Sequence, residues 1–168
     1  EITEADYLAI IEKKTSHLIS AACAVGALLA EAPAEKVAAL SRFGLNLGFA
    51  FQIIDDALDY TASENEFGKA IGKDLAEGKL TLPLIRTLQS CSATDRQTIT
   101  GIVADPARDE EALRTVLAII RRHDGLPYTL EMARRYIEEG KNELAVFPDT
   151  PPRRDLMALA DYVTARKS

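Results

Sequence analysis

Three aspartates within five residues are the part of this sequence with the clearest chemical potential. Asp55, Asp56 and Asp59 stand in the stretch FQIIDDALDY, among apolar residues that continue a helical pattern. On a helix, Gln52 and the three aspartates fall at positions i, i+3, i+4 and i+7, so they form one narrow stripe. Like charges at this spacing repel one another, and the end of a helix already disfavours negative charge. A divalent cation held by the carboxylates would offset both costs.

Magnesium is the cation that such a set of ligands favours. The aspartates supply oxygen atoms only, and Mg²⁺ takes one or two carboxylates, keeps several waters and accepts phosphate oxygens. The spacing alone leaves an alternative open, because an acidic, solvated helix end has the same pattern. The residues downstream must therefore decide between a metal site and a solvated helix end.

Lysines follow the aspartates in the segment GKAIGKDLAEGK, and a glycine precedes each of them. Glycine permits tight turns and a close approach of the backbone to a ligand, so Lys69, Lys73 and Lys79 could surround an anion. A mixed-charge surface loop is the alternative. Upstream, Lys14 falls on an apolar helical stripe, where a lysine needs an anionic partner unless its stem lies along the surface. Beside it, Thr15 could donate a hydrogen bond.

Cation-binding carboxylates and anion-binding lysines together indicate a metal-bound polyphosphate as the ligand. The glycine patterns of nucleotide-binding folds are absent from the sequence, so a nucleotide fold is not indicated.

The elements that must position these residues are helical from end to end. Apolar residues recur at helical spacing over residues 4–30, after Thr3 as the N-cap. The stripe consists of Tyr7, Ile11, Leu18, Ala22, Val25 and Leu29. Further helices are expected over residues 34–60, from Thr81, from Ser92, over 109–123, over 128–147 and from about Pro152, with an ordered loop over 61–80. No strand-like alternation occurs, so the prediction is an all-α helical bundle forming a single domain over residues 1–168, or part of one.

Composition limits the classes of partner. The chain has 168 residues and a net charge of −6, which provides no basic surface for nucleic acid or an anionic membrane. No continuous apolar run reaches the roughly 18 residues of a membrane span, so none is expected. Cys23 and Cys91 match no metal-ligand spacing, and we expect reduced thiols in a cytoplasmic protein.

Taken together, the motifs resemble the C-terminal half of a trans-isoprenyl diphosphate synthase, most similar to the long-chain polyprenyl branch. The stretches that carry the resemblance are KKTSHL, GFAFQIIDDALDY and GKAIGKDLAEGKLTLPLI, in that order. The resemblance implies the helical bundle of the isoprenoid synthase type. It also implies a Mg²⁺-dependent, head-to-tail condensation of an allylic diphosphate with isopentenyl diphosphate. Proteins of this family commonly form homodimers.

The resemblance also implies roles for individual residues. The family's second aspartate-rich motif, which binds Mg²⁺, is matched by Asp55, Asp56 and Asp59. Residues that hold the diphosphate, or lie on the same side of the pocket, are matched by Lys14, Lys69 and Lys79. Positions near the ionising carbon are matched by Thr15 and Gln52. Lys73 receives no role. We expect the aspartates to share one cleft with Lys14 and Lys69.

The sequence also departs from the family. It contains neither a first DDxxD motif followed by two arginines nor the N-terminal basic residues that bind isopentenyl diphosphate. Our interpretation is therefore the C-terminal portion of a prenyltransferase, inactive by itself. One alternative is a non-catalytic accessory subunit that contributes half a site. Another is a terpene cyclase, although Asp59 and Ser63 do not fit the second metal motif of cyclases. Product length is left open, because it depends largely on residues near the first aspartate motif.

Overall fold

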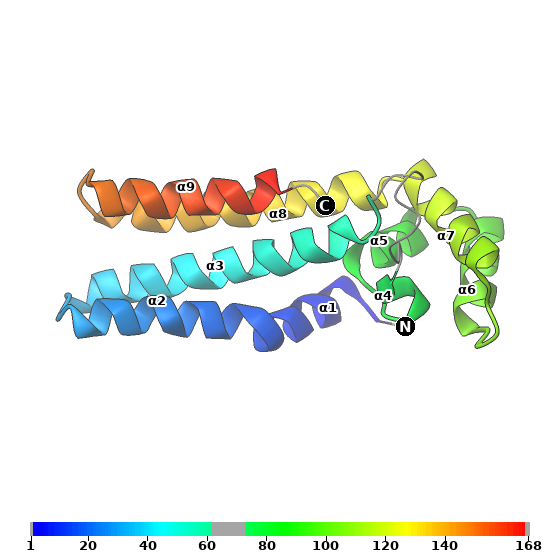
Figure 1. The fold of residues 1–168 in the computed structure, drawn as a ribbon, viewed down its shortest axis with the longest axis horizontal. Coiled ribbons are helices and arrows are strands. Elements are labelled where there is room, and N and C mark those ends of the chain that lie inside the picture. Colours follow the sequence, from blue (N-terminus) through cyan, green and yellow to red (C-terminus); the bar gives the residue numbers. More distant parts are fainter. Residues whose placement is uncertain (1, 62–72, 167–168) are drawn as a thin grey trace. The chain divides into compact units, whose positions relative to one another are not determined.

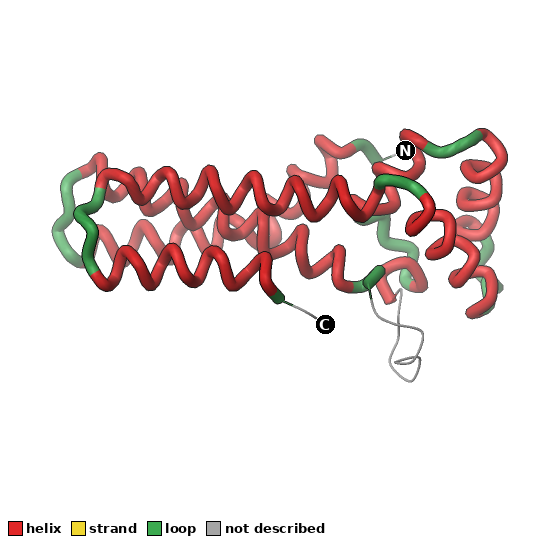
Figure 2. The backbone as a smooth tube through the Cα atoms, turned by 90° about the horizontal axis from the view of Figure 1, so that it is seen from above, coloured by secondary structure: helices red, strands yellow, loops and turns green. Residues whose placement is uncertain are grey.

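The computed structural model describes residues 2–61 and 73–166, and most of these residues are helical. Neither of the two ranges contains a strand, and Figure 2 shows helices joined by short loops. In chain order, the elements are α1 (Glu4–Ile11), the π-helical turn η1 (Glu12–Ser16), α2 (His17–Leu29), α3 (Ala34–Leu58), α4 (Lys73–Ala76), α5 (Leu82–Ser90), α6 (Ala93–Ala104), α7 (Glu110–Arg122), α8 (Gly125–Glu143), the 3₁₀ turn η3 (Leu144–Val146) and α9 (Pro151–Ala165). The all-α prediction is confirmed.

The chain divides into two compact units, which we describe separately. Unit 1 takes the N-terminal residues as far as Tyr7, together with Asp55–Thr129. Unit 2 takes Leu8–Ile54 and the helical residues from Leu130 onward. The single domain predicted over residues 1–168 stays a prediction.

Unit 2 is a bundle built from α2 and α9 with its own portions of α3 and α8. Figure 1 shows α2 beside α3 and α8 beside α9. Glycine permits the first of these contacts, because a Cβ at Gly44 would lie only 2.8 Å from the carbonyl oxygen of Ile19. Between α3 and α8, the rings of Phe49 and Tyr136 stack with 4.7 Å between their centroids. The bundle therefore holds its helices through both close backbone contact and aromatic packing.

A π-helical turn, η1, interrupts the helix that was predicted over residues 4–30. A π turn contains one residue more than an α-helical turn, so the inward face moves by about one residue after it. Ser16 at the end of η1 is buried, and so is Ala27 downstream in α2. The exposed residues include Leu18 at 75%, Val25 at 50% and Leu29 at 82%. The sequence prediction that these three face a core is therefore wrong, because it assumed an uninterrupted α-helical period.

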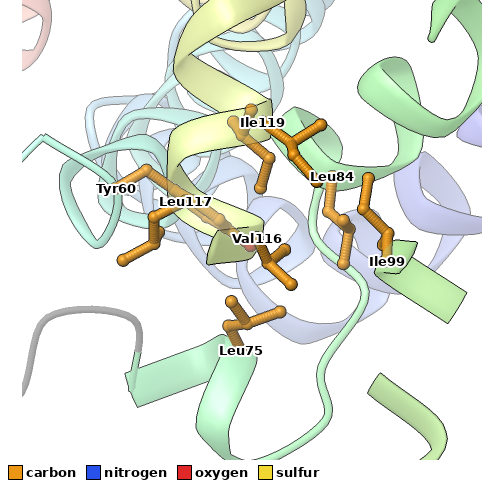
Figure 3. Close-up of a cluster of buried hydrophobic side chains, with 8 residues drawn as sticks. Tyr60, Leu75, Leu84, Ile99, Val116, Leu117 and Ile119 are labelled. Atoms are coloured by element: carbon orange, nitrogen blue, oxygen red, sulfur yellow. The ribbon is translucent and has the colours of Figure 1, made fainter. Parts of the chain in front are cut away.

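The core of unit 1 is a cluster of aliphatic side chains with one tyrosine, shown in Figure 3. Its buried members are Tyr60, Leu75, Leu84, Ile99, Val116, Leu117, Ile119 and Ile120. Each large apolar side chain that is removed from water stabilises the fold by about 1.5–3 kcal/mol. Tyr60, just after α3, also contacts the start of α5, since its hydroxyl lies 2.6 Å from that of Thr81, the N-cap residue of α5.

Helix starts in unit 1 follow local signals. At the start of α1, the backbone N–H of Asp6 donates to Thr3 Oγ1, and the Thr3 N–H donates to the Asp6 carboxylate. At α6, Ser92 Oγ accepts from the N–H of Asp95 at 3.1 Å. Both N-caps agree with the sequence prediction. In contrast, α4 lies in the segment predicted to be a loop, and α8 begins at Gly125 rather than near residue 128.

Among the described residues, α3 alone is long and apolar enough to cross a membrane by length and composition, with a window of mean hydropathy 1.4. Core helices satisfy the same criterion, and 56% of this window is buried within the structure. The absence of a membrane span therefore stays a prediction from the sequence.

Candidate functional site

The three aspartates at the end of α3 lie in different environments. Asp55 is exposed, Asp59 is partly buried, and Asp56 is only 6% exposed. A helix end that was merely solvated would leave all three carboxylates in water. The burial of Asp56 therefore favours a built site over the simple acidic surface that the sequence pattern left open.

Asp56 is held by a tyrosine from the start of α1. The hydroxyl of Tyr7 donates a hydrogen bond of 2.7 Å to Asp56 Oδ2, and Tyr7 is itself only 3% exposed. Burial and the neighbouring carboxylate charge both raise the pKa of the Tyr7 phenol far above its ordinary value. Tyr7 therefore stays a hydrogen-bond donor at any physiological pH. The bond fixes the acidic turn of α3 against the N-terminal segment of unit 1.

Asp59 organises the short helix that follows. Its two carboxylate oxygens accept backbone N–H bonds from Lys73 at 3.1 Å and Asp74 at 3.0 Å. Burial raises the pKa of Asp59, although these backbone donors act in the opposite direction. A bound cation would favour the ionised form that burial disfavours. Asp59 thus joins α3 to α4 through two backbone hydrogen bonds, and it presents a carboxylate whose negative charge is disfavoured by burial.

Lys79 lies in a cluster of opposite charges on the surface of unit 1. Its Nζ is 2.8 Å from Asp74 Oδ1 and 2.7 Å from Glu77 Oε2. Hydrogen bonds to these carboxylates raise the pKa of Lys79, so its ammonium group stays charged. Gly78 before it has a positive φ of 75°, which explains the choice of glycine in this turn. A diphosphate held by Lys79 would have to compete with both carboxylates, and the assigned role stays a prediction.

In unit 2, the structure brings together two of the predicted site residues. Thr15 Oγ1 donates a 2.8 Å hydrogen bond to Gln52 Oε1, from η1 to α3. The two segments touch through glycine, because a Cβ at Gly48 would lie less than 3.0 Å from Ser16 Cα. Single π turns of this kind often occur at functional sites, where they redirect side chains. Thr15 and Gln52 therefore contact each other, and their assigned position near the ionising carbon stays a prediction.

Of the two lysines predicted to hold the diphosphate, only Lys14 lies within the described residues. Lys14 is exposed in η1, so the expected core-facing position of this side chain is wrong, for the same reason as the shifted stripe in α2. Lys14 belongs to unit 2 and the three aspartates belong to unit 1. The cleft that Lys14 was predicted to share with the aspartates stays a prediction. Lys69 lies outside the described residues.

No group of three or more histidine, cysteine, aspartate or glutamate side chains is arranged for a metal ion within residues 2–61 and 73–166. The donor chemistry nevertheless suits Mg²⁺, which needs only one or two carboxylates and completes its shell with water and phosphate oxygens. Asp55 offers an exposed carboxylate, and Asp59 offers one with a raised pKa. Asp56 is hydrogen-bonded to Tyr7, a contact that the sequence prediction did not foresee, and its assignment as a metal ligand stays a prediction.

Two contributors to this region were missed from the sequence. Tyr7 was predicted only as a core residue, yet a buried tyrosine hydroxyl usually finds a polar partner, and this rule could have suggested an aspartate. Asp74 was seen only as part of a charged loop, but its N–H binds Asp59 and its carboxylate binds Lys79. No sequence signal marks a link of that kind, because it depends on the position of α4.

Comparison with known proteins identifies the family to which this chain belongs. The family model for polyprenyl synthetase matches residues 1–120, which is more than half of the chain. The chain belongs to the polyprenyl synthetase family. It is 41% identical over 168 residues to a geranylgeranyl diphosphate synthase of Methanosarcina mazei, covering 99% of this chain and 50% of that protein. It is 36% identical over 160 residues to a nonaprenyl diphosphate synthase of Mycobacterium tuberculosis, covering 95% of this chain and 48% of that protein.

Solved structures of polyprenyl synthases have the same fold. A polyprenyl synthase from Caulobacter crescentus, complexed with calcium and isoprenyl diphosphate, superposes with a TM-score of 0.92 at 36% identity. The match covers 100% of this chain and 51% of that one. A decaprenyl diphosphate synthase from Rhodobacter capsulatus gives a TM-score of 0.91 over 99% of this chain and 51% of its own. The chain thus spans about half the length of the polyprenyl synthetases that it matches.

Proposed function

We propose that this polypeptide forms the second-aspartate-motif part of a trans-prenyl diphosphate synthase, which joins isopentenyl diphosphate to an allylic diphosphate. The observation that carries the proposal is the built acidic turn at the end of α3, in a chain of the polyprenyl synthetase family. The matched relatives are named as synthases that make diphosphates, from geranylgeranyl to nonaprenyl. These names favour a synthase over a terpene cyclase or an accessory subunit.

The chemistry that we propose is stabilisation of a leaving diphosphate. Asp55 and Asp59 would hold Mg²⁺, which supplies positive charge to the diphosphate oxygens as the carbon–oxygen bond breaks. Asp56 would act through Tyr7, which fixes the turn that carries the other two carboxylates. The ammonium groups of Lys14, Lys69 and Lys79 would neutralise further phosphate charge, as the resemblance implies. Thr15 and Gln52, hydrogen-bonded to each other, would line the region near the ionising carbon.

A homodimer of the complete protein is part of the proposal. The apolar side chains exposed on α2 support it, because they cover one face of a helix and would be favourable to bury. A cytoplasmic location also remains a proposal. The named relatives make products of several lengths, so the product of this protein stays open.

The proposal is tested by prenyl transfer in the complete polypeptide that carries this sequence. Labelled isopentenyl diphosphate, an allylic diphosphate and Mg²⁺ should give an extractable polyprenyl product. Asp55→Asn should lower the turnover at saturating Mg²⁺ by about 10²-fold or more, because charge stabilisation of the transition state is lost. Asp155→Asn, which neutralises an exposed carboxylate on α9, is the matched control and should leave turnover unchanged. Near-normal turnover of Asp55→Asn would contradict the assignment.

A further inference from the structure

A cavity of about 340 Å³ opens at the surface of unit 1, between the N-terminal residues, α5 and α6, and Ile2, Gln89 and Arg96 of its lining are exposed. None of the predicted site residues lines it. Its apolar walls are formed by Ile2, Leu80, Ile85, Leu88, Ile99 and Val103. A cavity of this size is in the lower part of the range for small-molecule sites. Its lining is suited to a hydrocarbon chain, which gains stability for every methylene removed from water.

Four polar side chains also line the cavity, and two of them are already satisfied. Thr3 Oγ1 lies 2.7 Å from the Asp6 carboxylate, and Thr100 Oγ1 donates to the carbonyl of Arg96 at 2.8 Å. The others are Arg96 and Gln89. Within the described part of the chain, neither of these two side chains forms a hydrogen bond or ion pair. The cavity therefore offers one guanidinium and one carboxamide as donors beside apolar walls.

We propose that this cavity binds a single-chain anionic amphiphile, with its tail among the apolar walls and its head on Arg96. Because the volume is near the lower end of the range for small-molecule sites, a short tail of about ten carbon atoms is the length to test. A guanidinium presents a planar fork of donors that matches a carboxylate or a phosphate, and the Gln89 amide can donate as well. A neutral alkyl chain would fill the apolar part of the cavity but would gain nothing from the guanidinium of Arg96, which is exposed at its rim.

The inference does not depend on the proposed prenyl transfer, because it uses other residues and needs no catalysis. Two kinds of ligand share the required chemistry, namely a fatty-acid carboxylate and an isoprenyl monophosphate. Decanoate and geranyl monophosphate represent them with the same total of ten carbon atoms, and decanol is the neutral reference. Calorimetric titration of the 168-residue chain with each probe, below the concentration at which it aggregates, measures the three affinities.

Either anion should bind the cavity at least about tenfold more tightly than decanol, the effect of one charge-assisted contact at a partly solvated rim. The tighter anion identifies the source of the ligand. Arg96→Gln should remove the preference for the anion and leave decanol affinity unchanged. Arg135→Gln, which removes the same charge from an exposed position on α8, should have no effect. Equal affinities for decanol and both anions, or full anion affinity in Arg96→Gln, would overturn the proposal.

Variants that fill the cavity show whether a probe binds there or on the exposed apolar face of α2. Ala104→Trp places a large ring in the cavity from an exposed position, and Thr100→Trp does the same from one helical turn earlier. Circular dichroism establishes that a variant is folded before it is titrated. Loss of anion binding in either folded variant supports the site. Unchanged binding in both, or no binding of either anion to the unaltered chain, would refute it.

Discussion

The hydrogen bond between Tyr7 and Asp56 is the residue-scale contact on which the acidic turn depends. A carboxylate that is 6% exposed needs a donor, because a buried charge without one is costly. Tyr7→Phe removes that donor and keeps the ring, so we expect the free energy of unfolding to fall by about 1–3 kcal/mol in urea titrations. Tyr162→Phe is the control, since Tyr162 is 65% exposed and its hydroxyl can bind water. Equal losses in the two variants would show that the Tyr7 bond contributes nothing specific.

A second residue-scale prediction concerns Asp95, which joins α6 to α7. Its carboxylate contacts His123 Nε2 at 3.1 Å and Arg122 at 2.7 Å, and the contact with His123 is the largest cause that lowers its pKa. A depressed pKa in the folded state contributes stability above the unfolded value of about 3.9, and this contribution is lost as the pH falls through the folded value.

Asp95→Asn should therefore lower the free energy of unfolding at pH 7, and the difference from the unaltered chain should vanish near pH 2. Urea titrations at the two pH values measure this. Asp155→Asn serves as the control, because Asp155 forms no ion pair within residues 2–61 and 73–166. A difference that persists unchanged in acid would refute the role given to the Asp95 charge.

The acidic stripe itself could be read from the sequence at this scale, since the spacing of Asp55, Asp56 and Asp59 follows directly from helical geometry. The different burial and contacts of the three carboxylates could not be predicted from the sequence. Burial of Asp56 depends on Tyr7, which is 49 residues away in the chain. Sequence periodicity describes one helix at a time and carries no information on such distant partners.

At the scale of elements, glycine determines how closely η1 and α3 approach. A Cβ at Gly48 would lie closer to Ser16 than real side chains come, and the obstacle is backbone rather than a flexible side chain. Gly48→Ala should therefore cost about 1–3 kcal/mol of unfolding free energy, as in other overpacked contacts. Gly26→Ala is the matched control on α2, because no atom lies within 4 Å of its added Cβ.

That control should stabilise the chain slightly, by about 0.5–1 kcal/mol, because alanine favours a helix. Thermal and urea unfolding of both variants measure whether the free energy of unfolding falls or rises. If Gly48→Ala were as stable as Gly26→Ala, the close contact between η1 and α3 would be wrong. Since η1 carries Thr15, the Gly48 variant should also weaken the Thr15–Gln52 pair.

Most helices of this fold could be predicted from capping residues and apolar spacing, as Ser92 at the start of α6 illustrates. The π turn could not, because the sequence EKKTS has no signal that distinguishes it from an ordinary helical turn. Its consequence was large, since one additional residue turned the predicted core stripe of α2 toward solvent. The tertiary contacts through Gly44 and Gly48 select the observed face, and these contacts lie outside any local pattern.

At the scale of the whole molecule, α2 exposes more apolar surface than an isolated chain favours. Leu18, Leu28 and Leu29 are 75%, 60% and 82% exposed. Large apolar side chains exposed together on one helix favour burial against a partner, so we expect the chain to self-associate at micromolar concentration. Light scattering after size exclusion should show a mass that rises with concentration, and Leu18→Glu with Leu29→Glu should abolish the rise. The control variant Ala118→Glu, at an exposed site on α7, should still show the rise in mass with concentration. If the unaltered chain were a monomer at all concentrations, the prediction would be wrong.

The last prediction concerns catalysis by the 168 residues alone, which contain one DDxxD motif. We expect no measurable prenyl transfer from this chain when Mg²⁺, an allylic diphosphate and isopentenyl diphosphate are all supplied. Prenyl transfer of this type depends on charges arranged around the diphosphate before the reaction begins, and groups that act as a unit lose far more than a proportional share when some are removed. With one aspartate motif, only one side of the diphosphate can be held through metal ions.

Two measurements on this chain separate binding from turnover. Titration calorimetry with inorganic pyrophosphate should show weak binding that requires Mg²⁺ and is lost in Asp55→Asn, since the exposed carboxylate is the one best placed to share the cation with the ligand. Incubation with labelled isopentenyl diphosphate should nevertheless give no extractable product. Formation of product by the unaltered chain would show that one aspartate motif suffices, and the account of the site as half of a larger arrangement would then be wrong.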